Sequence, residues 1–393
     1  MSDVIIVGAG VIGTGIAHHL LERGVDKITI FERDSVGSGG TGKSAGIIRC
    51  HYGISAVASL ALSSLEFFEN AKEILGADIG FEQVGYLVGV GPENAEPFRA
   101  SLANQRSLGI DTREIGHAEV AELWPTAYLD DFATFCFEPR GGYGDGYATA
   151  QALASSIRSR GVTIRQGTSV RELVVAGDKV TGVRLADGSV EHADVVVLAA
   201  GPWSVPLAAS VGIALPIAPV YVQEVVIDPG IDLGAPPVFS DLVSKQYVHL
   251  RGAEMLFGNS SGESSLTPIE DPDVYPSRAS NDVIELVAEK AMHRFPGIED
   301  PRISTTATGV LDTTPDNNAI VSATGIDGLY LATGMSGHGF KIAPALAQLT
   351  AELILDGQTT LPGVRAEQFR LSRFEEGDLL VSPFPYRGAA AIR

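Results

Sequence analysis

The 393-residue chain is poor in the residues that mark secreted, metal-binding and nucleic-acid-binding proteins. Its two cysteines, Cys50 and Cys136, provide no disulfide framework and no metal-ligand set, which favours a reducing cytoplasm. Lys and Arg number 28 against 48 Asp and Glu, and the net charge of −20 argues against nucleic acid or an anionic membrane as a partner. No apolar run reaches the ~20 residues that cross a bilayer, so we expect no membrane insertion. The first expected strand begins so close to Met1 that we also expect no signal peptide.

The stretch over residues 3–32 predicts a dinucleotide-binding unit. An apolar run at residues 4–7 is typical of a buried strand, and Gly8-Ala9-Gly10-Val11-Ile12-Gly13 follows it directly. A helical pattern and a second strand at residues 28–31 come next, and Glu32 ends that strand. This is the G-x-G-x-x-G arrangement in which the helix N-terminus offers N–H groups to a pyrophosphate. An acid at the position of Glu32 accepts hydrogen bonds from a ribose diol, which disfavours NADP.

Further glycine-bearing segments predict a ligand that touches several loops. Residues 33–52 are rich in glycine and hydroxyl side chains, and we interpret them as a second cofactor-cradling segment instead of a loose surface loop. A buried strand at residues 194–198 runs into the small-residue turn Ala199-Ala200-Gly201. A strand at residues 327–333 precedes a third glycine-rich turn at residues 334–341 and then a helix. One NAD site does not explain this turn, whereas a flavin dinucleotide does.

The remaining pattern indicates two domains interleaved along the chain, because no linker separates two halves. We expect helices at residues 54–75, 97–108, 115–123, 148–160, 281–294 and 342–355. We expect strands at residues 81–90, 130–138 and 162–165, a hairpin over 170–185, and a strand-rich segment at 216–262.

Four motifs together resemble the D-amino acid oxidase superfamily of FAD enzymes, in the branch of sarcosine oxidases, glycine oxidase and dimethylglycine dehydrogenase. They are the fingerprint with Glu32, residues 40–49, residues 195–203, and Thr314-Pro315-Asp316 followed by residues 334–341. The resemblance implies an α/β fold with a Rossmann-type FAD-binding domain, whose parallel sheet has helices on one side and a β-hairpin layer on the other. That domain would comprise residues 1–77, 143–214 and 301–393. An interleaved α+β substrate-binding domain on a mostly antiparallel sheet would comprise residues 78–142 and 215–300.

The same resemblance implies a substrate amine that carries a carboxylate and is oxidised at its C–N bond. Hydride would pass to flavin N5 and the imine would hydrolyse, with O2 or another redox carrier as electron acceptor. Arg49 and Lys341 match the carboxylate-binding cations of the sarcosine oxidase branch. Their chemistry agrees, because arginine offers a planar fork and lysine a compact charge. Lys341 in a helix first turn either meets a local anion or, in the alternative interpretation, faces water.

Other expected site residues come from the same comparison. The turn Gly337-His338-Gly339 is expected to aim N–H groups at the flavin N1–C2=O edge, with His338 flavin-adjacent or structural. His51 either lines the substrate pocket or packs in the core, and Tyr247 and His249 lie on a strand expected to face the flavin. The expected FAD contacts are Gly8, Gly10, Val11, Ile12, Gly13, Glu32, Arg33, Gly40, Thr41, Lys43, Ser44, Ala45, Gly46, Ile47, Val170, Ala199, Ala200, Gly201, Trp203, Gly334, Gly337, His338, Gly339, Phe340 and Lys341.

Departures from these relatives sharpen the expectation. The covalent flavin cysteine and histidine of two relatives align with Gly309 and Lys43, so we predict non-covalent FAD. The lysine that aids reaction with oxygen aligns near Leu256, which leaves oxidase and dehydrogenase activity both open. Two positions of the sarcosine enzymes' aromatic cage carry Leu311 and Ser260, which favours a substrate larger than sarcosine. A subunit of a hetero-oligomeric dehydrogenase, a non-enzymatic FAD-binding assembly factor and an NAD-dependent dehydrogenase remain alternatives, and the oligomeric state stays open.

Overall fold

A six-stranded sheet carries the N-terminal fingerprint at its centre. The computed structural model describes residues 3–259 and 267–387. The strand order is β19–β20–β12–β1–β2–β8, and β19 alone among these six runs antiparallel to its neighbour. The strands are β1 (Val4–Val7), β2 (Ile28–Phe31), β8 (Thr163–Arg165), β12 (Val195–Leu198), β19 (Ile320–Ala323) and β20 (Leu329–Thr333).

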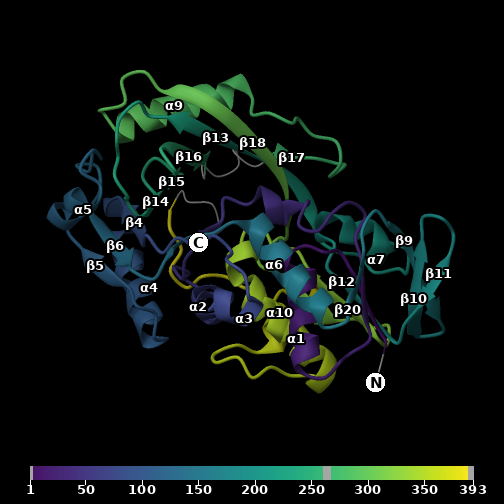
Figure 1. The fold of residues 1–393 in the computed structure, drawn as a ribbon. Coiled ribbons are helices and arrows are strands. Elements are labelled where there is room, and N and C mark those ends of the chain that lie inside the picture. The colour runs from purple at the N-terminus through teal and green to yellow at the C-terminus, as the bar shows by residue number, and fades with distance from the viewer. Residues whose placement is uncertain (1–2, 260–266, 388–393) are drawn as a thin grey trace.

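Side-chain alternation along β1 builds a different layer on each face of this sheet. Val4 and Ile6 belong to the core that packs under the helices, and Ile5 and Val7 belong to the core under a small three-stranded sheet. The helices are α1 (Val11–Glu22), α2 (Ser55–Glu69), α6 (Gly146–Ser159) and α10 (Gly339–Asp356), and the small sheet is β9 (Val170–Ala176), β10 (Lys179–Leu185) and β11 (Val190–His192). Figure 1 shows this sheet, in teal, on the opposite side from α1 and α10. The expected Rossmann-type layering is confirmed.

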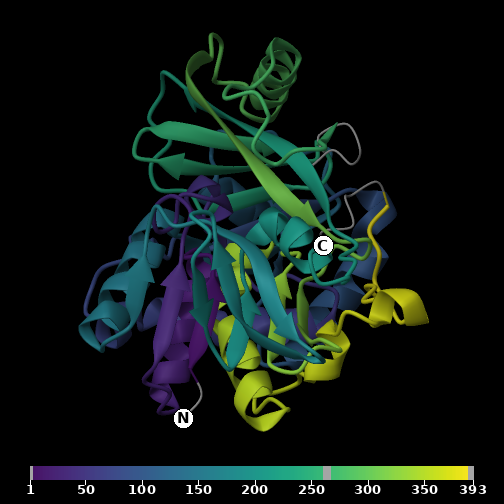
Figure 2. The same ribbon diagram turned by 90° about the vertical axis from the view of Figure 1, so that its right-hand side faces the viewer.

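A nine-stranded, mostly antiparallel sheet forms the second unit, which arches over the first in Figures 1 and 2. Its order is β17–β13–β16–β15–β14–β4–β6–β5, with β18 paired to β13. The strands are β4 (Tyr86–Val90), β5 (Arg113–Ile115), β6 (Thr134–Glu138), β13 (Ala218–Asp228), β14 (Val238–Asp241), β15 (Gln246–Arg251), β16 (Glu254–Asn259), β17 (Thr267–Pro268) and β18 (Arg302–Thr313). Trp124, Phe239 and Phe295 anchor its core beside α9 (Asn281–Arg294).

Short elements complete the described chain. They are α3 (Ala71–Leu75), α4 (Ala95–Ser107), α5 (His117–Leu123), α7 (Ser204–Ala209), α11 (Arg373–Glu376), β3 (Ile47–Ile48), β7 (Gly142–Tyr143) and the 3₁₀ turns η1 (Gly40–Lys43), η2 (Pro92–Asn94), η3 (Gly201–Trp203) and η4 (Ala366–Phe369). Across the described residues, the helices lack the combination of length and apolar character that a bilayer-spanning helix requires.

Several element boundaries differ from the sequence-based expectation. The helix expected over residues 54–75 is interrupted at Asn70, whose side-chain amide donates to the Glu66 carbonyl at 2.7 Å, a local bond that competes with helix geometry. Ile115 ends β5, so α5 begins at His117 and not at Ile115. The strand expected from residue 81 begins at Tyr86. Helix α10 begins at Gly339 and not at Ile342, which puts Lys341 inside its first turn.

The boundary expected at residue 301 falls just before β18, which pairs with β13 from Ala218↔Thr313 to Asp228↔Arg302. We therefore propose that the second segment of the substrate-binding domain extends through Thr313. The sequence did not indicate this strand because its first half, Arg302 to Ala307, is rich in Ser and Thr and largely exposed.

Candidate functional site

A cavity of about 1100 Å³ lies where the two sheets meet. It is larger than an ordinary small-ligand pocket and has room for a dinucleotide with a substrate beside it. Expected FAD contacts that form its wall are Gly8, Gly10, Val11, Ile12, Glu32, Arg33, Gly40, Thr41, Lys43, Ser44, Ala45, Ile47, Val170, Ala199, Ala200, Gly201, Trp203, Gly337, Gly339, Phe340 and Lys341. The sheet of the second unit adds Val222, Glu224, Ser240 and Tyr247. Residues that are far apart in the sequence thus surround one space.

The fingerprint has the close backbone approaches that its glycines predict. Gly8 has a φ of +105°, and a Cβ there would lie 2.5 Å from the Ala199 carbonyl oxygen. A Cβ on Gly13 would lie 2.0 Å from the Gly8 carbonyl oxygen. Helix α1 consequently starts tight against the ends of β1 and β12, with its N-terminus toward the cavity.

Glu32 is fixed by the fingerprint turn at the end of β2. One carboxylate oxygen accepts the Ala9 N–H and the other accepts the Asp34 N–H, both at 2.9 Å. Each oxygen keeps a further lone pair, and the side chain lines the cavity. This geometry fits the hydrogen bonds to a ribose diol that the sequence predicts.

Four expected FAD contacts lie outside the cavity wall. His338 points to Tyr52, whose hydroxyl is 2.9 Å from Nδ1, and Gly13 packs beneath Gly8. Gly46 has a φ of +73° and abuts the Gly144 carbonyl, and Gly334 donates its N–H to Asp312 at 2.7 Å. These four residues shape the turns behind the wall, and their expected contact with FAD stays a prediction.

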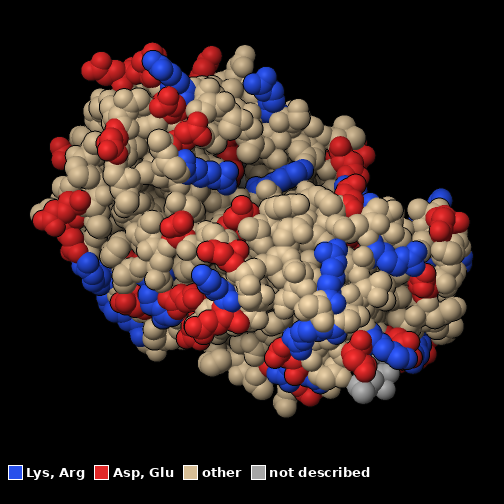
Figure 3. Space-filling view, viewed as in Figure 1, with Lys and Arg blue, Asp and Glu red and all other residues tan. Residues whose placement is uncertain are grey.

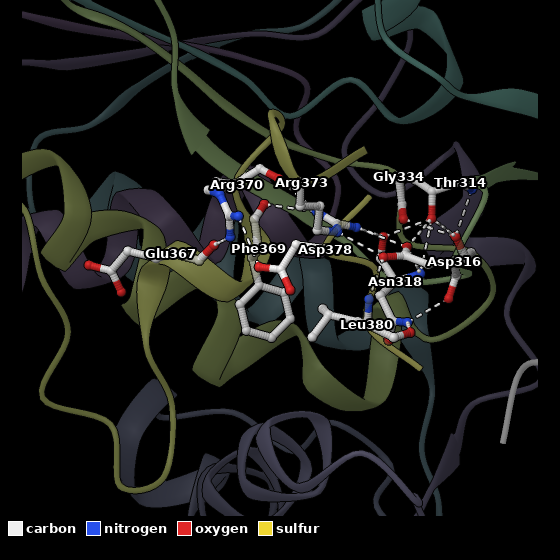
Figure 4. A network of polar contacts seen from close by, with 11 residues as sticks. Thr314, Asp316, Asn318, Gly334, Glu367, Phe369, Arg370, Arg373, Asp378 and Leu380 are labelled. Carbon is white, nitrogen blue, oxygen red and sulfur yellow. Dashed lines mark hydrogen bonds and ion pairs between the residues drawn. The ribbon is translucent and has the colours of Figure 1, made fainter. Parts of the chain in front are cut away.

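A buried polar network explains why Thr314-Pro315-Asp316 accompanies the turn at residues 334–341. The Thr314 N–H donates to Ser336 Oγ at 3.0 Å, and the Thr314 hydroxyl donates to the Asn318 carbonyl at 2.8 Å. Figure 4 shows Thr314, Asp316 and Asn318 converging with Arg373 from the C-terminal segment. The network ties the strand ends to the turn that precedes α10.

Arg49 and Lys341 both line the cavity and both are buried. The Arg49 guanidinium lies 4.2 Å from the centre of the Tyr52 ring and donates to the His51 carbonyl. Lys341 Nζ lies 3.5 Å from the Gly337 carbonyl oxygen. The structure therefore favours a local role for Lys341 over a side chain that faces bulk water.

The charge of Arg49 acts on a nearby acid, Glu138. Glu138 is buried, and its Oε2 accepts the Cys50 N–H at 2.8 Å. Burial raises the pKa of Glu138 to about 7, although the Cys50 N–H and the Arg49 charge act in the opposite direction. Among the described residues, no hydrogen-bond partner is found for its Oε1.

Of the other expected substrate contacts, Tyr247 lines the cavity and the two histidines do not. His51 lies 3.0 Å from the Tyr386 hydroxyl through Nε2 and stacks on that ring, so packing is the alternative that the structure supports. His249 Nε2 lies 2.9 Å from the Ala45 carbonyl and its ring stacks on Tyr143 at 4.5 Å. Burial lowers the pKa of His249 to about 4, so its ring is neutral near pH 7. The observed contacts of His51 and His249 favour packing, and their expected substrate roles stay predictions.

Sequence reasoning missed several acidic residues of the cavity wall, among them Glu224 and Asp273. Glu224 accepts a hydrogen bond from Tyr247, and its place in the apolar β13 was a signal that sequence reasoning did not use. Asp273 receives both Arg33 amino groups, at 2.9 and 2.6 Å, and the Trp203 indole N–H at 3.1 Å. On the face that Figure 3 draws, Lys and Arg lie scattered or beside Asp and Glu.

Together, the Rossmann-type unit, the interleaved sheet and the shared cavity define a flavin dinucleotide enzyme. The family model described as FAD dependent oxidoreductase matches residues 3–353, and the chain belongs to this family of FAD-dependent amine and amino-acid oxidoreductases. The expected superfamily and the FAD cofactor are thereby confirmed, and the NAD-dependent alternative is wrong.

Three relatives illustrate the similarity. The chain is 28% identical over 392 residues to 4-methylaminobutanoate oxidase (formaldehyde-forming) of Paenarthrobacter nicotinovorans, covering 94% of this chain and 45% of that protein. It is 29% identical over 403 residues to sarcosine oxidase subunit beta of Arthrobacter sp., covering 99% and 94%. Its fold matches L-proline dehydrogenase from P. horikoshii with a TM-score of 0.87 and 26% identity, covering 96% and 99%. The chain thus spans less than half the length of the first of these relatives.

Proposed function

We propose that this chain oxidises the C–N bond of a small amine that carries a carboxylate, such as an N-alkyl amino acid. The observation that carries the proposal is that Arg49 and Lys341 both line the cavity whose wall holds the dinucleotide fingerprint. The relatives named for 4-methylaminobutanoate, sarcosine and L-proline all act on compounds with an amine and a carboxylate, which supports this substrate class.

Each part of the cavity has a task in this reaction. Arg49 and Lys341 hold the substrate carboxylate, which orients the carbon next to nitrogen. Bound FAD supplies the two-electron acceptor for the hydride that leaves this carbon. The apolar wall, which includes Val222 and Leu311, limits water around the substrate, and the imine product hydrolyses after the oxidation.

We propose that FAD is held without a covalent bond. Gly309 and Lys43 both line the cavity where two relatives carry a linking cysteine or histidine, and neither forms that linkage. Lys43 instead donates to the Tyr275 hydroxyl. Acid precipitation is expected to release all of the yellow colour into the supernatant.

The test is a substrate screen of the purified, FAD-loaded chain without oxygen. Sarcosine, 4-methylaminobutanoate, L-proline and D-amino acids are added in turn while flavin absorbance is followed. Bleaching by a carboxylated amine supports the proposal, whereas a flavin that no amine reduces favours a non-enzymatic assembly role. The expectation of a substrate larger than sarcosine is based on Leu311, which lines the cavity, and on Ser260, which lies outside the described residues. The same screen tests this expectation, because its amines differ in size.

A second candidate is a subunit of a hetero-oligomeric dehydrogenase, because the similarity to a sarcosine oxidase subunit beta covers 99% of the chain. Leu256, where a relative has a lysine, is buried in β16. Because leucine lacks the charge by which that lysine aids reaction with oxygen, we propose either O2 or another redox carrier as the electron acceptor. Peroxide yield after reduction separates these acceptors. Light scattering of the native protein gives the mass of the assembly, which reveals any partner subunits. The cytoplasmic location expected from the cysteine content stays a prediction, which cell fractionation tests.

A further inference from the structure

Three residues lie in one row across neighbouring strands of the second unit's sheet. Gly258 on β16 is paired with Tyr247 on β15 and also with Glu224 on β13. The Tyr247 hydroxyl donates to Glu224 Oε1 at 2.8 Å, so the tyrosine side chain reaches across the whole width of β16. A Cβ on Gly258 would lie 1.8 Å from Cζ of that ring. Because Gly258 has no side chain, the Tyr247 ring can lie over β16 and donate its hydrogen bond to Glu224.

The row faces the cavity, because Glu224 and Tyr247 both belong to its wall. On the other side of Glu224 the paired residue of β18 is Ala307, which also lines the cavity and is small. The carboxyl group therefore stands between two small neighbours, with space in front of it. A cavity-facing acid of this kind is costly without a partner of opposite charge.

The charged groups around Glu224 are few and can be named. Tyr247 and Arg251 come from β15, and both lower the pKa of Glu224, whereas burial raises it and has the largest effect. Lys43 on η1 packs against Gly309, which is paired with Val222 two residues from Glu224. Arg49 and Lys341 belong to the wall of the same cavity.

We propose that Glu224, held by Tyr247, receives an N–H of the substrate's ammonium group and takes its proton. The cavity then recognises both ends of a zwitterion, with the carboxylate at Arg49 and Lys341 and the ammonium at Glu224. In the proton transfer the N–H bond breaks, an O–H bond forms on the carboxylate, and the nitrogen keeps the electron pair. No electrons are gained or lost in this step, and the proton later leaves to water. The freed lone pair is what the oxidation of the adjacent carbon requires.

This inference deepens the proposed function and rests on it. The sequence alone assigned no residue to the removal of the amine proton. The row of Tyr247, Gly258 and Glu224 supplies such a residue from elements that lie close only after the sheet has formed.

The test compares Glu224→Gln with the unaltered protein, both loaded with FAD, using two ligands of equal length. Sarcosine has the amine, and butanoate has a CH2 group in its place. Binding is read by stopped flow without oxygen, from the rapid shift in flavin absorbance that precedes any reduction. We expect Glu224→Gln to weaken sarcosine binding by roughly 10- to 100-fold and to leave butanoate and FAD binding unchanged. Above the pKa of free sarcosine the difference between the two proteins should shrink, because the amine arrives without its extra proton.

Two further variants separate chemistry from folding. Tyr247→Phe keeps the acid and removes its hydrogen-bond donor, and Gly258→Ala displaces the tyrosine ring. Because the bond from Tyr247 lowers the pKa of Glu224, both variants should shift the pH dependence of sarcosine binding toward higher pH. An equal loss of sarcosine and butanoate binding, an altered FAD affinity, or no change in any variant would overturn the proposal. If no amine reduces the unaltered protein, the proposed oxidation fails, yet the comparison of the two ligands still decides the role of Glu224.

Discussion

Arg373 and Asp316 form a two-pronged ion pair in which neither side chain is exposed. Arg373 Nε donates to Asp316 Oδ2 at 2.8 Å and Nη2 donates to Oδ1 at 3.0 Å, as Figure 4 shows. The Leu380 N–H also donates to Asp316, at 3.1 Å. The pair therefore fastens the C-terminal segment to the strand end that supports the turn before α10.

Asp316→Asn should destabilise the protein by about 3–5 kcal/mol, because it leaves the Arg373 charge buried without its partner. Urea unfolding of the FAD-saturated protein measures this change. The matched control is Arg370→Ala, which removes a neighbouring arginine whose pairs with Glu376 and Asp378 lie at the surface. That control should unfold at the same urea concentration as the unaltered protein. Equal effects of the two substitutions would contradict a special role for the buried pair.

Arg49→Lys should raise the KM for a carboxylated amine by roughly 10- to 100-fold, because lysine keeps the charge but loses the planar fork. The charge beside Glu138 is retained, so the protein should still fold and remain yellow. Steady-state kinetics with the amine found in the screen provides the measurement. Arg33→Lys is the control, since Arg33 pairs with Asp273 in the same cavity wall and should leave the KM unchanged. An unchanged KM in Arg49→Lys would remove Arg49 from the carboxylate site.

The sequence predicted the parts of the site that are local in the chain. The fingerprint and Glu32 lie within one strand–helix–strand unit, so spacing alone determines their geometry. Arg49 and Lys341 were proposed through the family resemblance, because nothing in their neighbourhoods indicates that the two residues line the same cavity. Glu224 and Arg373 were missed because their partners are defined by strand register and by a buried network far along the chain. The sequence could not decide between a substrate role and packing for His51 and His249, because a histidine near a site satisfies its hydrogen bonds equally well in the core.

Glu138 should make stability fall as the pH rises from 5 to 8. Its pKa is raised from 4.5 to about 7 by burial, so the folded state keeps a proton that the unfolded state releases in this range. This contribution is fully present below the unfolded pKa and is lost as the pH rises through 7. The Tm of the unaltered protein should therefore drop more between pH 5 and pH 8 than that of Glu138→Gln.

Glu69→Gln is the control for this pH dependence. Arg140 lowers the pKa of Glu69, so its contribution is present above 4.5 and is lost only at lower pH. Its substitution should leave the Tm difference between pH 5 and pH 8 as it is in the unaltered protein. Identical pH dependence in the unaltered protein and Glu138→Gln would show that Glu138 is ionised in the folded state at pH 5.

Asp273→Asn should weaken the binding of FAD. The residue lies in a segment of the cavity wall that comes from the second unit, and it binds Arg33 and Trp203 of the Rossmann-type unit. The pair is partly exposed, so the expected increase in the FAD dissociation constant is up to roughly fivefold. Added salt should weaken FAD binding in the unaltered protein more than in the variant, because salt screens the same ion pair. Asp34→Asn is the matched control, since Asp34 also pairs with Arg33 but its carboxylate has no hydrogen-bond or ion-pair partner in the second unit among residues 3–259 and 267–387. If both substitutions release FAD equally, the bridge between the two units does not retain the cofactor.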